Sequence, residues 1–138
     1  MLSAADAYVS AAFYEGWSVA ASEAAWVGLP LLLSDVGGAA ELVGSASGPG
    51  DGPRGRVVVH PCGDPLGVDD AAIAMQADEA RATHEVELAD AMMMIASDLQ
   101  EWRARGDEIR AWARAALTPT TFTTHYIKIL KNTLKRHN

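Results

Sequence analysis

Two glutamates in this sequence could bind sugar groups. Glu15 and Glu23 stand eight positions apart, and Gly16 directly follows the first of them. A carboxylate can accept hydrogen bonds from two adjacent hydroxyl groups, so the pair could flank one bound molecule and hold sugar hydroxyls at each end. Gly16 has no side chain and therefore lets the backbone approach a ligand closely.

The elements expected around these glutamates are a strand, a tight turn and a helix. A buried strand is predicted at Ala7 to Ala12, and a slim, alanine-rich helix is predicted to end near Gly28. The first amides of a helix have no internal partner and carry the positive end of the helix dipole, so they attract phosphate. Ser18 is a candidate cap for this helix. The backbone amides placed to bind an anion are those of Gly16, Trp17, Ser18 and Val19.

A wider pattern extends beyond the glutamate pair. It consists of Tyr14-Glu15-Gly16-Trp17, Glu23, Gly28-Leu29-Pro30, Ser34-Asp35-Val36-Gly37-Gly38 and Glu41. It resembles the retaining glycosyltransferases of family 4, which have the GT-B fold and a signature of two glutamates separated by seven residues in the donor-binding domain. The resemblance covers about Ala4 to Pro65, with a looser helical similarity to the end. The sequence departs from the family at Ser18, where glycine is usual, and at Ala20, where proline is frequent.

The resemblance implies a role for each candidate residue. Glu23 matches the glutamate that holds the ribose hydroxyls of the nucleotide. Glu15 matches the one near the donor sugar, and we assign it sugar positioning or charge stabilisation as the candidate catalytic residue. The amides from Gly16 to Val19 would contact the diphosphate and the sugar, whereas Trp17 either lines the sugar pocket or packs in the core.

The implied activity is transfer of a hexosyl group from a nucleotide-diphosphate sugar to an acceptor, with retention of configuration. By resemblance, a sugar or lipid-linked acceptor would bind through an N-terminal domain that this sequence does not match, so we expect the isolated chain to be inactive. Two alternatives remain: a non-catalytic truncated or assembly module, and a fragment of a GT-B sugar-nucleotide epimerase. The glutamate spacing followed by Ser34-Asp35-Val36-Gly37-Gly38 favours the transferase.

The order of elements predicts an α/β fold with a partial Rossmann-like parallel sheet of about three strands, flanking helices and a helical C-terminal region. We expect a single partial domain over residues 1–138, with a nucleotide-sugar-binding part at 1–65 and a helical part at 66–138. After the first helix, strands are predicted at Leu29 to Leu33 and at Arg56 to His60. A short helix is predicted between them, at Ala39 to Val43. Gly44 to Gly55 is predicted to be a flexible loop, and Asp35 is expected to cap the short helix, with an anion-binding nest at 35–38 as the alternative.

The second half predicts helices. Val68 to Gln76 is expected to be a short helix, Glu87 to Leu99 an amphipathic one, and Asp98 to Leu117 one or two helices with a break at Gly106. The last helix is predicted at Thr121 to Lys135, with Thr120 or Thr121 as its cap.

Composition excludes several function classes. The net charge of −7 argues against a general nucleic-acid-binding protein. The single cysteine, Cys62, excludes an internal disulfide and a cysteine zinc cluster and suits a reducing, cytoplasmic compartment. His60 and His84 have no metal-like partners in the sequence and are expected to be structural, so we expect no metal and no cofactor.

Two surfaces predict contacts with partners. The last helix carries Lys128, Lys131, Lys135 and Arg136 and no acidic residue. We favour a match to the helix dipole, with contact to an anionic membrane at the cytoplasmic face as the alternative. The strand from Ala7 to Ala12 would be central in a complete sheet, so its exposed apolar edge predicts a two-fold homodimer.

Overall fold

The computed structural model describes residues 2–45, 49–60 and 70–136, with the backbone alone at 70–81, 125, 129 and 134–136. The expected turn at Gly63-Asp64-Pro65, Cys62, the boundary at 65/66 and the start of the expected helix at Val68 lie outside the described residues. In chain order, the elements are η1 (Leu2–Ala4), β1 (Tyr8–Ser10), α1 (Val19–Trp26), β2 (Leu31–Ser34), α2 (Ala39–Val43), β3 (Gly50–Gly52), β4 (Gly55–Val58), α3 (Asp70–Ser97), α4 (Leu99–Ala116) and α5 (Pro119–Arg136).

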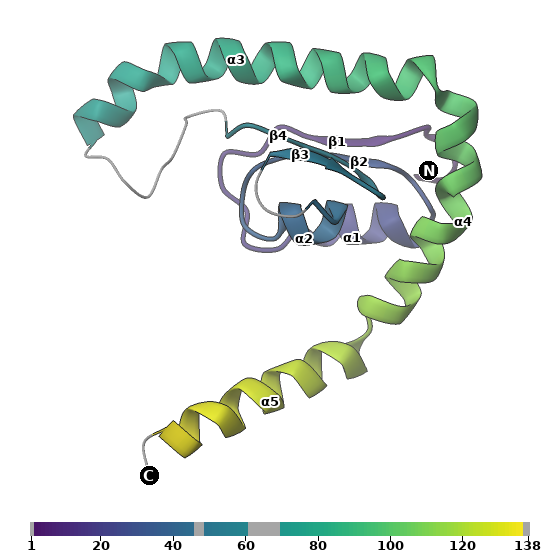
Figure 1. Ribbon diagram of the computed structural model, residues 1–138, viewed down its shortest axis with the longest axis vertical. Helices are drawn as coiled ribbons and strands as arrows, with labels where there is room; N and C mark the ends of the chain where they lie inside the picture. The colour runs from purple at the N-terminus through teal and green to yellow at the C-terminus, as the bar shows by residue number, and fades with distance from the viewer. Residues whose placement is uncertain (1, 46–48, 61–69, 137–138) are drawn as a thin grey trace.

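The elements form a layered α/β structure. Helices α1 and α2 cover one face of the sheet and α3 crosses the other, while α4 runs along one end and α5 leads away from the body (Figure 1). The strand order is β1-β2-β4-β3, with β1, β2 and β4 parallel to one another. The predicted partial Rossmann-like parallel sheet is therefore confirmed, and β1 lies at one edge of it.

A fourth strand corrects the prediction of a flexible loop at Gly44 to Gly55. Strand β3 pairs antiparallel with β4, and Asp51 lies opposite Arg56 with 3.6 Å between the carboxylate and the guanidinium. Its glycines have low intrinsic preference for strands, which is why composition indicated a loop. Close packing explains one of them, because a Cβ added to Gly52 would lie 2.6 Å from the carbonyl oxygen of Val43.

Two apolar clusters fill the layers on either side of the sheet. Successive residues of a strand point to opposite faces, and the fully buried β2 accordingly contributes Leu31 and Leu33 to the cluster under α1 and Leu32 to the cluster under α3. The α1 side of the first cluster consists of Ala21, Ala24 and Ala25, which are fully buried. Because these side chains are small, α1 lies close to the sheet, as its composition predicted.

The helical half contains longer helices than predicted. Helix α3 is continuous where two separate helices, at Val68 to Gln76 and at Glu87 to Leu99, were expected. Helix α4 continues through Gly106, so the predicted break there is wrong. Gly106 is buried, and a Cβ added to it would lie 3.1 Å from the carbonyl oxygen of Gly28. The glycine permits the end of α1 to approach α4 closely. Arg110 completes this junction by donating to the carbonyl oxygen of Val27 at 3.1 Å.

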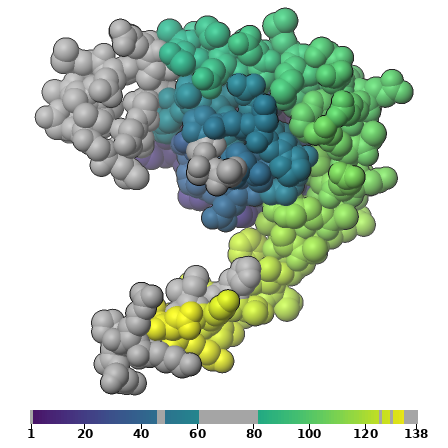
Figure 2. Space-filling model, in the orientation of Figure 1, coloured from purple at the N-terminus to yellow at the C-terminus, as the bar shows by residue number. Residues whose placement is uncertain are grey.

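Helix α5 begins differently from the prediction and extends into solvent. Thr118, not Thr120 or Thr121, is the cap: its hydroxyl accepts a hydrogen bond from the Thr121 amide at 3.1 Å, and Pro119 opens the helix. In the space-filling view the later part of α5 stands clear of the rest of the visible face (Figure 2). Within the described ranges, no helix is both long enough and apolar enough to cross a membrane.

Candidate functional site

The turn between β1 and α1 has the capped helix start that the sequence predicts. Ser18 is the N-cap of α1, and its hydroxyl accepts a hydrogen bond from the Ala21 amide at 3.2 Å. This bond satisfies one of the first amides of the helix. The amides of Val19 and Ala20 lie in the first turn, where no intrahelical acceptor exists, so they can bind an anion at the positive end of the dipole.

The two candidate glutamates lie on the solvent side of this strand, turn and helix. Glu15 lies in the turn, and Glu23 lies on the face of α1 opposite to the buried alanines. Both side chains are exposed, and among the residues that the structure describes neither carboxylate has an ion-pair partner. Both carboxylates are therefore free to accept hydrogen bonds from a ligand.

The floor beneath the turn is formed by the ends of two parallel strands. The Ser34 hydroxyl, at the end of β2, donates to the carbonyl oxygen of Ser10, at the end of β1, at 3.4 Å. A cavity of about 10 Å³ between these serines, Glu15 and Ser18 has room for about one water molecule. Ligands of open α/β sheets bind outside the carboxyl ends of the strands. A ligand as large as a nucleotide sugar would therefore lie over the turn.

Trp17 is half-buried and faces the body of the protein. Its indole N–H donates to the Ser22 hydroxyl at 3.0 Å, and its ring packs against the apolar cluster under α1. The ring also makes a T-shaped contact with Phe122 of α5, with 5.9 Å between ring centroids and an interplanar angle of 86°. Of the two roles expected for Trp17, core packing is the one with described contacts; lining of a sugar pocket stays a prediction.

The loop at 35–38 lies against the turn, a relation that the sequence analysis missed. Gly38, not Asp35, is the N-cap of α2, and it makes no side-chain cap hydrogen bond, so the expected cap is wrong. The Gly38 amide donates to the carbonyl oxygen of Gly16 at 3.0 Å. This amide is thus already used within the protein and is not available to an anion, which removes one donor from the alternative nest.

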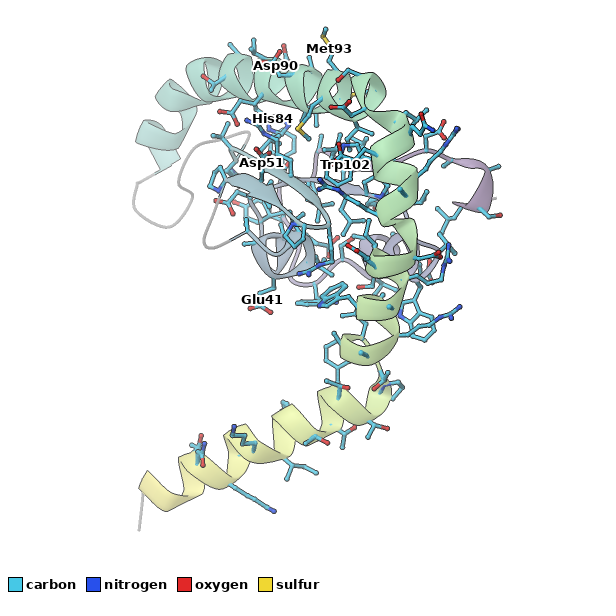
Figure 3. The ribbon with its side chains drawn as sticks, turned by 45° about the vertical axis from the view of Figure 1, so that its right-hand side comes forward. Glu41, Asp51, His84, Asp90, Met93 and Trp102 are labelled. Carbon is cyan, nitrogen blue, oxygen red and sulfur yellow. The ribbon has the colours of Figure 1, made fainter. Side chains whose placement is uncertain are left out.

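His60 and His84 are buried, and a ring nitrogen of each lies within hydrogen-bond distance of a backbone carbonyl oxygen. His60 Nε2 lies 3.0 Å from the carbonyl oxygen of Phe13, and His84 Nδ1 lies 2.8 Å from that of Val59. Figure 3 shows His84 directed from α3 toward the sheet, whereas Asp90 and Met93 point outward from the same helix. Among the described residues, no group of three His, Cys, Asp or Glu side chains is arranged to hold a metal ion.

Arg54 binds the end of α2 instead of the turn. Its Nε donates to the carbonyl oxygen of Leu42 at 2.6 Å and its terminal nitrogen to that of Glu41 at 2.8 Å, while the guanidinium carbon lies 3.7 Å from the centroid of the Trp112 ring. Burial lowers the pKa of the Arg54 guanidinium from its usual value. Arg56 pairs with Asp51 on β3. Both arginines are therefore engaged within the fold.

Comparison with known proteins bears on this turn. Residues 1–65 match the family described as glycosyl transferases group 1. The matched segment contains the capped turn, both glutamates and the loop at 35–38, and it supports a GT-B glycosyltransferase that takes a sugar from a donor. It covers less than half of the chain, 65 of 138 residues. No curated protein and no solved structure matches the chain.

Proposed function

We propose that this chain is the donor-binding part of a retaining family 4 glycosyltransferase of the hexosyltransferase type, which uses a nucleotide-diphosphate sugar. One observation carries the proposal: the segment matched to group 1 glycosyltransferases folds into an exposed, Ser18-capped turn at the carboxyl edge of parallel strands. That edge is where open α/β sheets bind nucleotides.

Each site residue has a chemical role in this proposal. The amides from Gly16 to Val19 bind the diphosphate and stabilise the negative charge that grows on it as the sugar leaves. Glu23 accepts hydrogen bonds from the two ribose hydroxyls, for which one ionised carboxylate has enough acceptor sites. Glu15 lies on the side of the donor sugar, where it positions the sugar or stabilises charge.

A second, N-terminal domain is proposed to bind the acceptor and to supply further basic groups. Arg54 and Arg56 are held by carbonyls and Asp51 within the fold, which supports an outside source for the cations that would assist the leaving diphosphate. We therefore propose that residues 1–138 form a single partial domain that binds the donor weakly and does not turn over alone. A cytoplasmic location is part of the proposal, and the single cysteine supports it.

Amide chemical shifts test this proposal on the chain itself. The ¹⁵N-labelled chain would be titrated with uridine, guanosine and adenosine diphosphates, and with the matching nucleosides as controls. At least one diphosphate should shift the amides of Gly16 to Val19 and of Glu23 in a saturable way, and its nucleoside should do so much less. Shifts confined to other surfaces, or none with any of the three diphosphates, would overturn the proposed donor site.

A further inference from the structure

The loop at 35–38 touches the underside of the turn at a point where only glycine fits. Gly37 has a φ of +50°, and a Cβ added to it would lie 2.0 Å from the carbonyl oxygen of Glu15 and 2.3 Å from that of Gly16. Residues with a side chain rarely adopt this backbone conformation, and a Cβ atom essentially never lies so near to an oxygen atom. The backbones of the loop and the turn are therefore in direct contact.

Gly38 is needed because the Trp17 ring lies close to it, and not because its backbone conformation is unusual. Its φ is −83°, which any residue adopts, yet an added Cβ would lie 2.4 Å from Cε3 and 2.7 Å from Cζ3 of Trp17. The three nearest atoms all belong to the Trp17 ring. The absence of a side chain at Gly38 thus lets the indole rest on the loop, next to the hydrogen bond from the Gly38 amide to the carbonyl oxygen of Gly16.

The other sides of the indole are also held. Its N–H donates to the Ser22 hydroxyl, and that hydroxyl donates to the carbonyl oxygen of Ser18 at 2.8 Å. Phe122 of α5 makes a T-shaped contact with the ring. By contrast, the outer side of the turn is open, because a Cβ added to Gly16 would meet nothing within 4 Å. The contacts found for the turn therefore come from beneath it.

We propose that Gly37, Gly38 and Trp17 form a clamp that fixes the turn from Glu15 to Ser18 for anion binding. The inference rests on the proposed function for the identity of the anion, a diphosphate. It gives Gly37, Gly38 and the ring of Trp17 a positioning role, while the backbone amide of Trp17 stays among the proposed donors to the anion. A turn held in one conformation presents its amides to the anion without first being ordered, and this preorganisation raises affinity.

A substitution that adds a methyl group against the Trp17 ring tests the clamp. Gly38→Ala should weaken binding of inorganic pyrophosphate to the chain by about tenfold, measured from the amide shifts of the turn. Gly52→Ala is the matched control, since its Cβ also collides, at 2.6 Å from the carbonyl oxygen of Val43, but on β3. Gly52→Ala should leave the affinity for pyrophosphate within about twofold of the wild-type value. This should hold even if it lowers the unfolding midpoint as much as Gly38→Ala does. Equal losses of affinity in the two variants would overturn the clamp.

A double-mutant cycle separates positioning from general destabilisation. Trp17→Leu removes the ring with which the new methyl group of Gly38→Ala collides, so the two changes should not add: Gly38→Ala should cost little further affinity in the Trp17→Leu background. Trp26→Leu, at the exposed end of α1, serves as the control tryptophan. Additive losses for Gly38 and Trp17 would contradict the proposal.

The clamp can also be tested without a ligand. Gly38→Ala should shift the amide signals from Glu15 to Ser18 and speed hydrogen exchange at residue 38, whose amide bonds to Gly16. Unchanged signals and exchange would overturn the clamp. If the wild-type chain binds no pyrophosphate, the proposed donor site is wrong, while this measurement still decides whether the loop positions the turn.

Discussion

Glu23 provides a test in which stability and binding should separate. Its side chain is exposed and has no ion-pair partner among the described residues. Glu23→Gln should therefore change the free energy of unfolding by no more than about 0.5 kcal/mol, as surface substitutions do. If Glu23 holds the ribose hydroxyls, the variant should lose about 1.5–3 kcal/mol of binding to a nucleoside diphosphate, the range for hydrogen bonds to a charged group. That loss corresponds to about 10-fold to 160-fold in the dissociation constant.

Variant and wild-type chains are titrated with the nucleoside diphosphate that shifts the amide signals of the turn most. Binding is measured by ligand-observed NMR or by calorimetry. Glu108→Gln, at an exposed glutamate of α4, controls for the loss of one negative charge. The 2′,3′-dideoxy form of the nucleotide controls for the hydroxyls, because it should bind the variant and the wild type equally. Unchanged affinity for the ribose nucleotide, or an equal loss with the dideoxy form, would refute the assignment.

Three other surfaces give predictions of their own. Arg54→Ala removes two hydrogen bonds and a cation–π contact at the end of α2, so urea unfolding should show a loss of about 2–4 kcal/mol; a loss below about 0.5 kcal/mol would show that these contacts contribute little. The exposed edge of β1 should cause self-association that rises with concentration in light scattering and falls in Val9→Lys, whereas a constant monomer mass would speak against it. Because we assign the positive charges of α5 as a group to the helix dipole, the chain should show no salt-sensitive sedimentation with anionic vesicles. Sedimentation that Lys128→Gln together with Lys131→Gln abolishes would favour the membrane.

Local signals explain the parts of the fold that the sequence predicts. Alanines at helical spacing, Ser18 before them and Gly28 after them define α1, and the apolar run before Ser34 defines β2. Each of these signals acts on its own neighbours in the chain, so one sequence is enough to interpret it. The same holds for the Ser18 cap, the part of the candidate site that was predicted and found.

Of the features that the sequence did not predict, β3 is local: it pairs with the next strand, β4, and its glycines, which do not favour strands, hid that hairpin. The other missed features depend on distant contacts. Gly106 indicated a helix break, whereas its role depends on Gly28 across the α1–α4 junction. Likewise, nothing local to Trp17 indicates that it meets Phe122 from α5. A glycine or a tryptophan has several uses, and only the fold decides among them.

The α1–α4 junction has a consequence for synthesis of the chain. Gly28 meets Gly106, and Arg110 binds the carbonyl oxygen of Val27, so the helix that carries Glu23 is covered by residues made much later. At about 5–20 residues per second, the ribosome needs about 4–16 s to extend the chain from Gly28 to Gly106. During that interval the buried alanines of α1 lack Ile109 and Ala113 of α4 as neighbours. A nascent chain would therefore expose this side of the helix until α4 emerges, which makes that interval the period when chaperones or misfolding would act on the turn that precedes α1.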